Sequence, residues 1–282
     1  MTNEQKLQIK NALVRYVADF TTQYDAAVSL INVSNASITL IVSDNWQLIN
    51  KEQWCHIAEQ VGFYDTRLVA ADTTATLLLR LLMGDAKRNK LCYGIAASTG
   101  IGKTFIAKNY TRENDNILFV SCNPTQNRRT FMMQVCFMAG IDTSGTVPEL
   151  IKKLSNYLSK KDDPLLIIDN AHVLKNRCLH LLVLLKAALT PFAGIVIMGN
   201  EDLRIKITEG INLKKIGFDE LYEAIGKQFI SIPALIYNDT ELICNANNVY
   251  DEDIIKYINT KCNGNLHFAA RLIEQAQLKY AA

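Results

Sequence analysis

One stretch of the sequence, residues 97–104, has residue types and spacing that can do chemistry. It reads Ala-Ser-Thr-Gly-Ile-Gly-Lys-Thr, and it lies between an apolar run, residues 91–96, and a helix-like segment that begins at Lys103. A glycine-bearing turn lets backbone N–H groups point at an anion, a lysine at this spacing reaches the β- and γ-phosphates, and the hydroxyl after it reaches Mg²⁺. The start of the helix adds a favourable dipole. The first position is Ala97 where the strict pattern has glycine, so the strand before the loop and the helix after it carry the prediction.

This loop predicts a site for ATP and Mg²⁺. The residues expected to bind the nucleotide are Ser98, Thr99, Gly100, Ile101, Gly102, Lys103 and Thr104. A second motif, residues 165–169, is four apolar residues that end in Asp169, which is typical of a buried strand that delivers a carboxylate to the metal of a bound nucleotide. We expect Thr104 and Asp169 to hold Mg²⁺. Asn200 follows another apolar run, residues 195–198, and its amide can orient a water against the γ-phosphate.

The elements that must position these residues alternate between strands and helices. The expected strands are 91–97, 117–122, 165–169, 195–198 and 229–232. Between the strands we expect a loop and helix over 98–111 and further helices at 129–139, 147–158, 176–189 and 220–226. The stretch from 200 to 215 is polar and basic. Such alternation predicts an α/β fold with a parallel sheet covered on both faces and ligands at the carboxyl ends of its strands. Helices at about 239–246, 251–260 and 265–279 follow.

The first sixty residues predict a small helical bundle. Amphipathic segments at 3–21, 24–31, 36–43 and 51–61, with Ser34 or Asn35 as an N-cap, form the short helix, tight turn and short helix of a helix-turn-helix. On that interpretation Asn35, Ser37 and Thr39 face outward and reach phosphates or base edges. The alternative is a helical interaction module without nucleic acid, because this recognition helix carries no Arg or Lys.

Residues 63–90 link the two parts through a helix that we expect to be capped near Asp72 and Thr73. The charged run at 87–90 then precedes the first strand, and we expect it to be a solvated turn. The net charge is only +2, so contact with DNA has to come from local patches. The seven cysteines contain no C-x-x-C pair, and the four histidines show no metal-ligand spacing. The polar N-terminus and the absence of a long apolar helix favour a soluble cytoplasmic protein without membrane contact.

The chain resembles the AAA+ ATPases and, more narrowly, the transposition target-selection ATPases exemplified by the B protein of phage Mu. Beside the phosphate loop, the matching segments are residues 166–171, 196–200, 225–229 and 264–266. The resemblance implies a helix-turn-helix DNA-binding domain at 1–62, a helical linker at 63–90, an AAA+ P-loop NTPase core at 91–235 and a helical lid at 236–282. It assigns Lys103 and Thr104 to Walker A, Asp169 to Walker B and Asn200 to sensor 1.

The family function that follows from the resemblance is ATP-dependent assembly on double-stranded DNA and delivery of a target to the transposase of a mobile element. The assembly would be a homo-oligomeric ring or helical filament. The residues expected to contact DNA from the core are Arg128, Arg129, Lys206, Lys214 and Lys215. The alternative for these cations is a solvated basic face or a contact between subunits.

Three departures from the family pattern weaken hydrolysis but leave nucleotide binding intact. Asn170 stands where the family has its catalytic glutamate, and Ala224 stands where related sequences carry an arginine finger. His267 takes the place of the sensor 2 arginine, and Arg271, one turn later, can substitute for it in contacting the nucleotide. Loss of a general base costs on the order of 10²- to 10⁴-fold in rate.

The sequence therefore predicts ATP binding with slow hydrolysis. His172 or Glu201 are alternative bases. A signalling or defence regulator, in which a nearly inactive AAA+ domain holds a helix-turn-helix and a partner, is the competing function; a P-loop kinase or metabolic transferase is the third.

Overall fold

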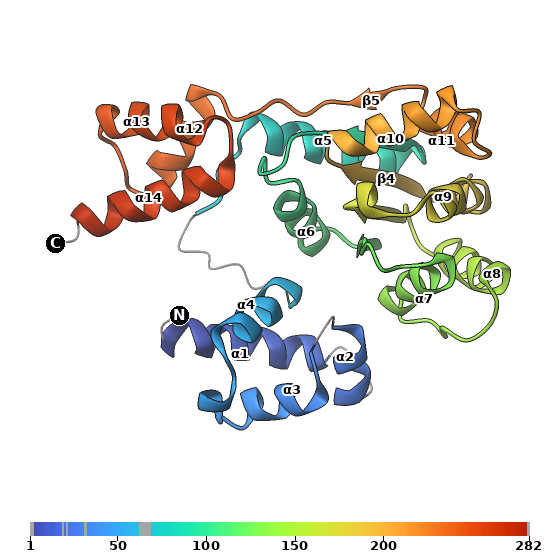
Figure 1. Ribbon diagram of the computed structural model, residues 1–282, viewed down its shortest axis with the longest axis horizontal. Helices are drawn as coiled ribbons and strands as arrows, with labels where there is room; N and C mark the ends of the chain where they lie inside the picture. The colour runs from blue at the N-terminus through green and yellow to red at the C-terminus, as the bar shows by residue number, and fades with distance from the viewer. Residues whose placement is uncertain (1–2, 19, 21, 31–32, 62–68, 281–282) are drawn as a thin grey trace. The chain divides into compact units, whose positions relative to one another are not determined.

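The computed structural model of the chain describes residues 3–18, 20, 22–30, 33–61 and 69–280. The chain divides into two compact units, residues 1–68 and residues 69–282 (Figure 1). The expected domain boundary between residues 62 and 63, and Asn32 of the expected turn, lie outside the described residues.

The first unit is all-helical. Its helices are α1 (Asn3–Ala18), α2 (Gln23–Ser29), α3 (Asn35–Val42) and α4 (Lys51–Gln60), with a 3₁₀ turn at Trp46–Leu48. Trp54 and Ile57 of α4 belong to the same hydrophobic cluster as Ile38 and Ile41 of α3, and all four side chains are buried. Ser34 caps α3 by accepting a hydrogen bond from the backbone of Ser37, so the expected cap is confirmed.

The second unit is built on a five-stranded sheet in which every pairing is parallel. Its strands are β1 (Cys92–Ala96), β2 (Ile117–Ser121), β3 (Leu165–Asp169), β4 (Gly194–Gly199) and β5 (Phe229–Ile230), in the order β2-β3-β4-β1-β5. The α/β fold class is confirmed. Because β4 lies between β1 and β3, the carboxyl ends of β1, β4 and β3 meet at one edge, where the residues with expected chemistry follow them.

Helices cover both faces of this sheet, as the apolar strands require. On one face, α5 (Thr74–Asn89) and α6 (Lys103–Glu113) pack over Leu165 and Ile167. On the other, Leu166 and Ile168 pack against the remaining core helices. These are α7 (Arg128–Met138), α8 (Val147–Leu158), α9 (Asn176–Leu189), α10 (Glu201–Asn212) and α11 (Phe218–Ala224).

Two segments differ from expectation. The charged run at 87–90 is not a free turn: Lys87 and Arg88 lie in the last turn of α5, where cations complement the helix dipole, and Lys90 is the left-handed C-cap. The stretch after Asn200 is helix α10, because Leu203 and Ile207 form a buried stripe that the surrounding polar residues hide in the sequence.

The chain ends in three helices, α12 (Tyr237–Ala246), α13 (Glu252–Cys262) and α14 (Leu266–Tyr280) (Figure 1). Asp239, which is 2% exposed, accepts hydrogen bonds from the backbone and hydroxyl of Thr74, so α12 is joined to the start of α5. The six cysteines that the structure describes are free thiols, and all except Cys92 are buried. Across the described ranges, no helix is both long enough and apolar enough to cross a membrane.

Candidate nucleotide-binding site and basic pocket

The loop after β1 has the backbone that its glycines predict. Gly100 and Gly102 adopt left-handed conformations, with φ of 88° and 91°. Gly102 is the N-cap of α6 and offers no side-chain hydrogen bond to the helix. The start of α6 therefore lacks a side-chain cap, and the N-terminus of a helix is a favourable place for an anion held in the loop.

Lys103 points into the curve of this loop. Its Nζ donates to the carbonyl oxygens of Ala97, at 2.7 Å, and Ser98, at 2.9 Å. Burial lowers the pKa of Lys103, while the charges of Asp169 and Glu201 act in the opposite direction. The ammonium is thus placed where the phosphates of a loop-bound nucleotide would lie.

Thr104 and Asp169 meet directly. The Thr104 hydroxyl donates to Oδ2 of Asp169 at 2.6 Å, and Asp169 is fully buried. The other oxygen, Oδ1, is also buried and has no hydrogen-bond partner among the described residues. Burial raises the pKa of Asp169, and the bonds from Thr104 and the backbone of Asn170 partly oppose this. A hydroxyl beside a carboxylate with an unpaired oxygen fits a hard cation such as Mg²⁺.

Asn170 is fixed by a residue that the sequence did not single out. Its backbone is left-handed, with φ of 56°, a conformation that asparagine tolerates well. Its Nδ2 donates to the hydroxyl of Ser121 at 3.1 Å. Ser121 lies opposite Asp169 in the pairing of β2 with β3. No sequence signal marks this serine, because only the strand register brings it to the site.

The two alternative bases, His172 and Glu201, both interact electrostatically with Lys103. Burial lowers the pKa of His172, which favours the neutral imidazole, and its buried Nδ1 has no hydrogen-bond partner among the described residues. Glu201 interacts electrostatically with Lys103 and also forms an ion pair with Arg204. That His172 or Glu201 acts as the general base stays a prediction.

Asn200 lies at the end of β4, between the loop that follows β1 and the end of β3. Its side-chain oxygen accepts from the backbone of Asp202 at 3.1 Å, and its Nδ2 donates to the Asp202 carboxylate at 2.7 Å. The amide therefore caps α10, and the same geometry holds it near the carboxyl edge of the sheet.

The start of α14 lies against the phosphate loop. The backbone N–H of Leu266 donates to the carbonyl of Gly100 at 2.8 Å. A Cβ at Gly100 would lie 2.4 Å from Nδ2 of Asn265, so the loop needs glycine here to accommodate the C-terminal helices. His267 and Arg271 follow on α14, and both side chains are exposed.

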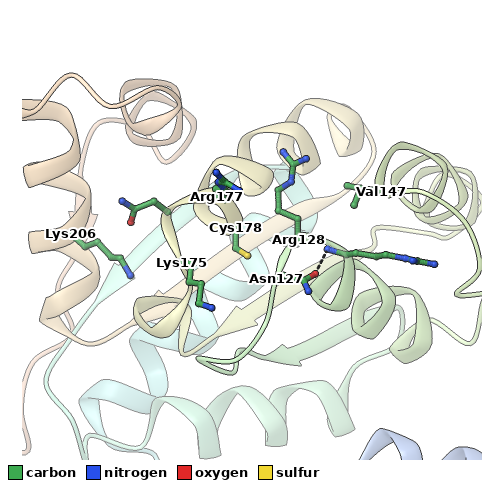
Figure 2. A pocket seen from close by; sticks show the side chains of 9 residues that line it. Asn127, Arg128, Val147, Lys175, Arg177, Cys178 and Lys206 are labelled. Carbon is green, nitrogen blue, oxygen red and sulfur yellow. Dashed lines mark hydrogen bonds between the residues drawn. The ribbon is translucent and has the colours of Figure 1, made fainter.

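The cations expected to contact DNA fall into two groups. Arg128, Arg129 and Lys206 line one pocket of about 920 Å³, whereas Lys214 and Lys215 are exposed after α10 and do not line it (Figure 2). The other residues lining the pocket are Asn127, Val147, Lys175, Asn176, Arg177 and Cys178.

Two of the lining cations, Lys175 and Arg177, were missed from the sequence. They flank the start of α9, a few residues after Asp169. Cations beside the beginning of a helix that follows a site strand were the sequence signal that could have found them. The ammonium of Lys206 donates to the carbonyl oxygens of His172 and Leu174, and burial lowers its pKa.

The polar residues of α3 are largely occupied within the helical unit. The expectation that Ser37 faces outward is wrong: the side chain is 8% exposed and its hydroxyl bonds that of Ser34. Gln23 of α2 donates to the Asn35 side-chain oxygen at 2.6 Å and to the Thr39 hydroxyl at 2.8 Å. Asn35 and Thr39 remain exposed.

Comparisons with known proteins agree with the core of this assignment. Residues 86–207 match the family model of an AAA domain, and this range contains the phosphate loop, Asp169 and Asn200. A comparison with curated proteins found no match. This match, the parallel sheet and the loop geometry together support an AAA-type P-loop ATPase domain in the second unit.

Proposed function

We propose that this protein binds ATP and Mg²⁺ and uses the bound nucleotide as a switch for assembly on double-stranded DNA, which it then delivers to the transposase of a mobile element. The observation that carries the nucleotide part is the hydrogen bond from Thr104 to the buried carboxylate of Asp169. It joins two motifs that are 65 residues apart in the chain. The narrower assignment, to relatives of the phage Mu B protein, rests on the sequence resemblance.

The residues present fit the nucleotide. The turn at Gly100 and Gly102 and the uncapped start of α6 offer backbone N–H groups to phosphate oxygens. Lys103 supplies a cation, and Thr104 and Asp169 supply oxygen ligands for the metal. When bound, Mg²⁺ neutralises negative charge on the phosphates.

The residues around Asp169 support slow hydrolysis. A catalytic carboxylate would have to accept a proton from water, but Asn170 is neutral and its amide is bonded to Ser121. Nucleotide binding can still shift the protein between states, because binding energy alone biases a conformational equilibrium.

The support for DNA comes from charge. Arg128 and Arg129 gather with other cations at one pocket, and Lys214 and Lys215 are exposed. Contacts of this kind neutralise phosphates without reading sequence, which suits a protein that selects many targets. Repetition of the cations along a ring or filament of this chain would extend the contact.

The test combines binding with imaging. Wild type should bind ATP, and Lys103→Ala should weaken binding at least tenfold. Electron microscopy of wild type with duplex DNA of arbitrary sequence should show regular assemblies with ATP and none with ADP. ATP binding that is unaffected by Lys103→Ala would contradict the nucleotide site. Assemblies that form equally with ATP, with ADP and without nucleotide would contradict the role of ATP as a switch for assembly.

A second candidate function is favoured by α3. Its sequence contains no cation, and Gln23 engages both Asn35 and Thr39. Such a helix suits a protein partner better than a phosphate backbone, as in a signalling or defence regulator with a nearly inactive ATPase domain. ATP-dependent assemblies on arbitrary DNA would contradict this candidate, whereas the absence of DNA binding by the wild-type chain, both with and without ATP, would support it.

A further inference from the structure

The pocket of Figure 2 is built from the beginnings of two helices. α7 begins at Arg128 after its N-cap Asn127, and α9 begins at Asn176 after its N-cap Lys175. The Lys175 side chain makes no capping hydrogen bond. Each helix start carries partial positive charge from its peptide dipoles. The backbone alone therefore makes this pocket electropositive.

Side chains add to this charge. Arg128, Arg129, Lys175 and Arg177 are exposed, and the described residues that line the pocket include no carboxylate to neutralise them. Within the described part of the chain, none of these four forms an ion pair. Like charges that line one pocket repel one another, and a bound anion relieves the repulsion.

The remaining polar groups of the pocket are compatible with an anion. Burial raises the pKa of the Cys178 thiol, so the thiol stays neutral and adds no negative charge. The amides of Asn127 and Asn176 also lie at the pocket. Lys206 is held by the carbonyl oxygens of His172 and Leu174, so it adds charge to the wall while it tethers the segment that leads from β3 to α9.

The cations are spread across the pocket. In Figure 2 the guanidinium groups of Arg128 and Arg177 extend to one side and the ammonium of Lys175 extends to the other. A ligand with several linked phosphates can contact cations on both sides. The volume of about 920 Å³ also suits a ligand larger than one phosphate.

We propose that this pocket is a second phosphate site, separate from the P-loop, that binds a chain of phosphate groups through Arg128, Arg129, Lys175 and Arg177. The phosphates are either the backbone of a nucleic acid or a free oligophosphate. In the first case the inference rests on the proposed function and names the surface that holds the DNA. In the second it stands apart from that function.

The experiment uses the full chain with Lys103→Ala, so that the P-loop does not compete for the probes. In this background, Lys175→Gln/Arg177→Gln is compared with Lys152→Gln/Lys160→Gln, which removes the same charge from exposed positions of α8 and the residues after it. Both pairs are exposed, and thermal unfolding checks that each variant folds. The probes are inorganic tripolyphosphate, followed by calorimetry, and a short duplex DNA of arbitrary sequence, followed by fluorescence anisotropy over a salt series.

We expect the Lys175/Arg177 variant to bind at least one probe tenfold or more weakly, while the Lys152/Lys160 control binds as the parent does. For DNA, the slope of log affinity against log salt should fall by about 1.8, because each lost phosphate contact contributes about 0.9. A loss with DNA alone identifies a nucleic acid backbone, and a loss with tripolyphosphate identifies a free oligophosphate.

Unchanged affinity for both probes would overturn the second phosphate site. This failure is distinct from failure of the proposed function. If Lys214→Gln/Lys215→Gln abolishes DNA binding and the Lys175/Arg177 variant binds both DNA and tripolyphosphate as the parent does, DNA binding stands and the pocket is overturned. If wild type forms no assembly with ATP and DNA, but tripolyphosphate binding requires Lys175 and Arg177, the pocket stands and the proposed function is overturned.

Discussion

Restoring a carboxylate after Asp169 is the sharpest test of why hydrolysis should be slow. Asn170→Glu places a base where the family has one. General-base catalysis is worth roughly 10²- to 10⁴-fold in rate. At about 1.36 kcal/mol for each factor of ten, the expected fall in activation free energy is about 2.7–5.4 kcal/mol. Ala224 still lacks the arginine of related sequences, so the increase should lie at the lower end of this range.

The substitution also has a cost that the structure makes visible. Glutamate loses the hydrogen bond that Asn170 donates to Ser121, a net contribution of about 1 kcal/mol. Its backbone must keep φ of 56°, which costs a residue other than glycine or asparagine about 1 kcal/mol more. The free energy of unfolding should fall by about 2 kcal/mol, or about 4–8 °C in Tm for a unit of this size.

Asn170→Gln is the matched control. It has the length of glutamate and the same backbone and hydrogen-bond penalties, but it cannot accept a proton from water at neutral pH. We expect both variants to lose similar stability by chemical denaturation, while only Asn170→Glu gains steady-state ATP turnover in a coupled assay with and without DNA. Fast wild-type turnover that neither variant changes would refute the role assigned to Asn170 and direct attention to His172 or Glu201.

Two further predictions address the buried carboxylate and the helical unit. Because burial raises the pKa of Asp169, the folded state holds this proton to higher pH than the unfolded state does. The free energy of unfolding should therefore fall as the pH rises from the ordinary pKa of aspartate through the raised pKa of Asp169. Asp169→Asn should remove this pH dependence from urea-denaturation curves measured over a pH series. Both tryptophans of the chain, Trp46 and Trp54, lie in the first unit, so tryptophan fluorescence, excited selectively, reports that unit alone. Trp54→Ala removes a fully buried side chain and should lower its stability by about 3–5 kcal/mol, seen through Trp46, while ATP binding in the second unit is retained; a parallel loss of ATP binding would contradict the independence of the two units.

Local patterns were sufficient for much of the core. The bounds of α8, α9 and β3 agree with the expected 147–158, 176–189 and 165–169, because each segment has a strong apolar period and clear ends. Where the apolar stripe was sparse, as in α10, the helix was missed: burial of Leu203 and Ile207 against the rest of the core stabilises a segment whose composition is polar.

The direction in which side chains point was harder to predict from the sequence than the bounds of the helices and strands. Ser37 was expected to face DNA, yet its side chain is buried and its hydroxyl is hydrogen-bonded to the hydroxyl of Ser34. The orientation of α3 places this side of the helix toward the interior of the helical unit. Lys175 and Arg177 carried no motif, and they join Arg128 and Arg129 only because the segments that follow β2 and β3 lie side by side.

The sequence by itself determined the phosphate loop, since glycines at 100 and 102 permit the left-handed turn and the lysine and threonine follow at fixed spacing along one chain segment. It also determined the buried strand that ends in Asp169. Only the tertiary structure decided which groups meet those residues: the Thr104 hydroxyl bonds Asp169, Ser121 accepts from Asn170, and the start of α14 donates to the loop. The physical reason is that local conformation follows from neighbours in the chain, whereas strand order and register bring together groups separated by tens of residues, and no short pattern encodes that pairing.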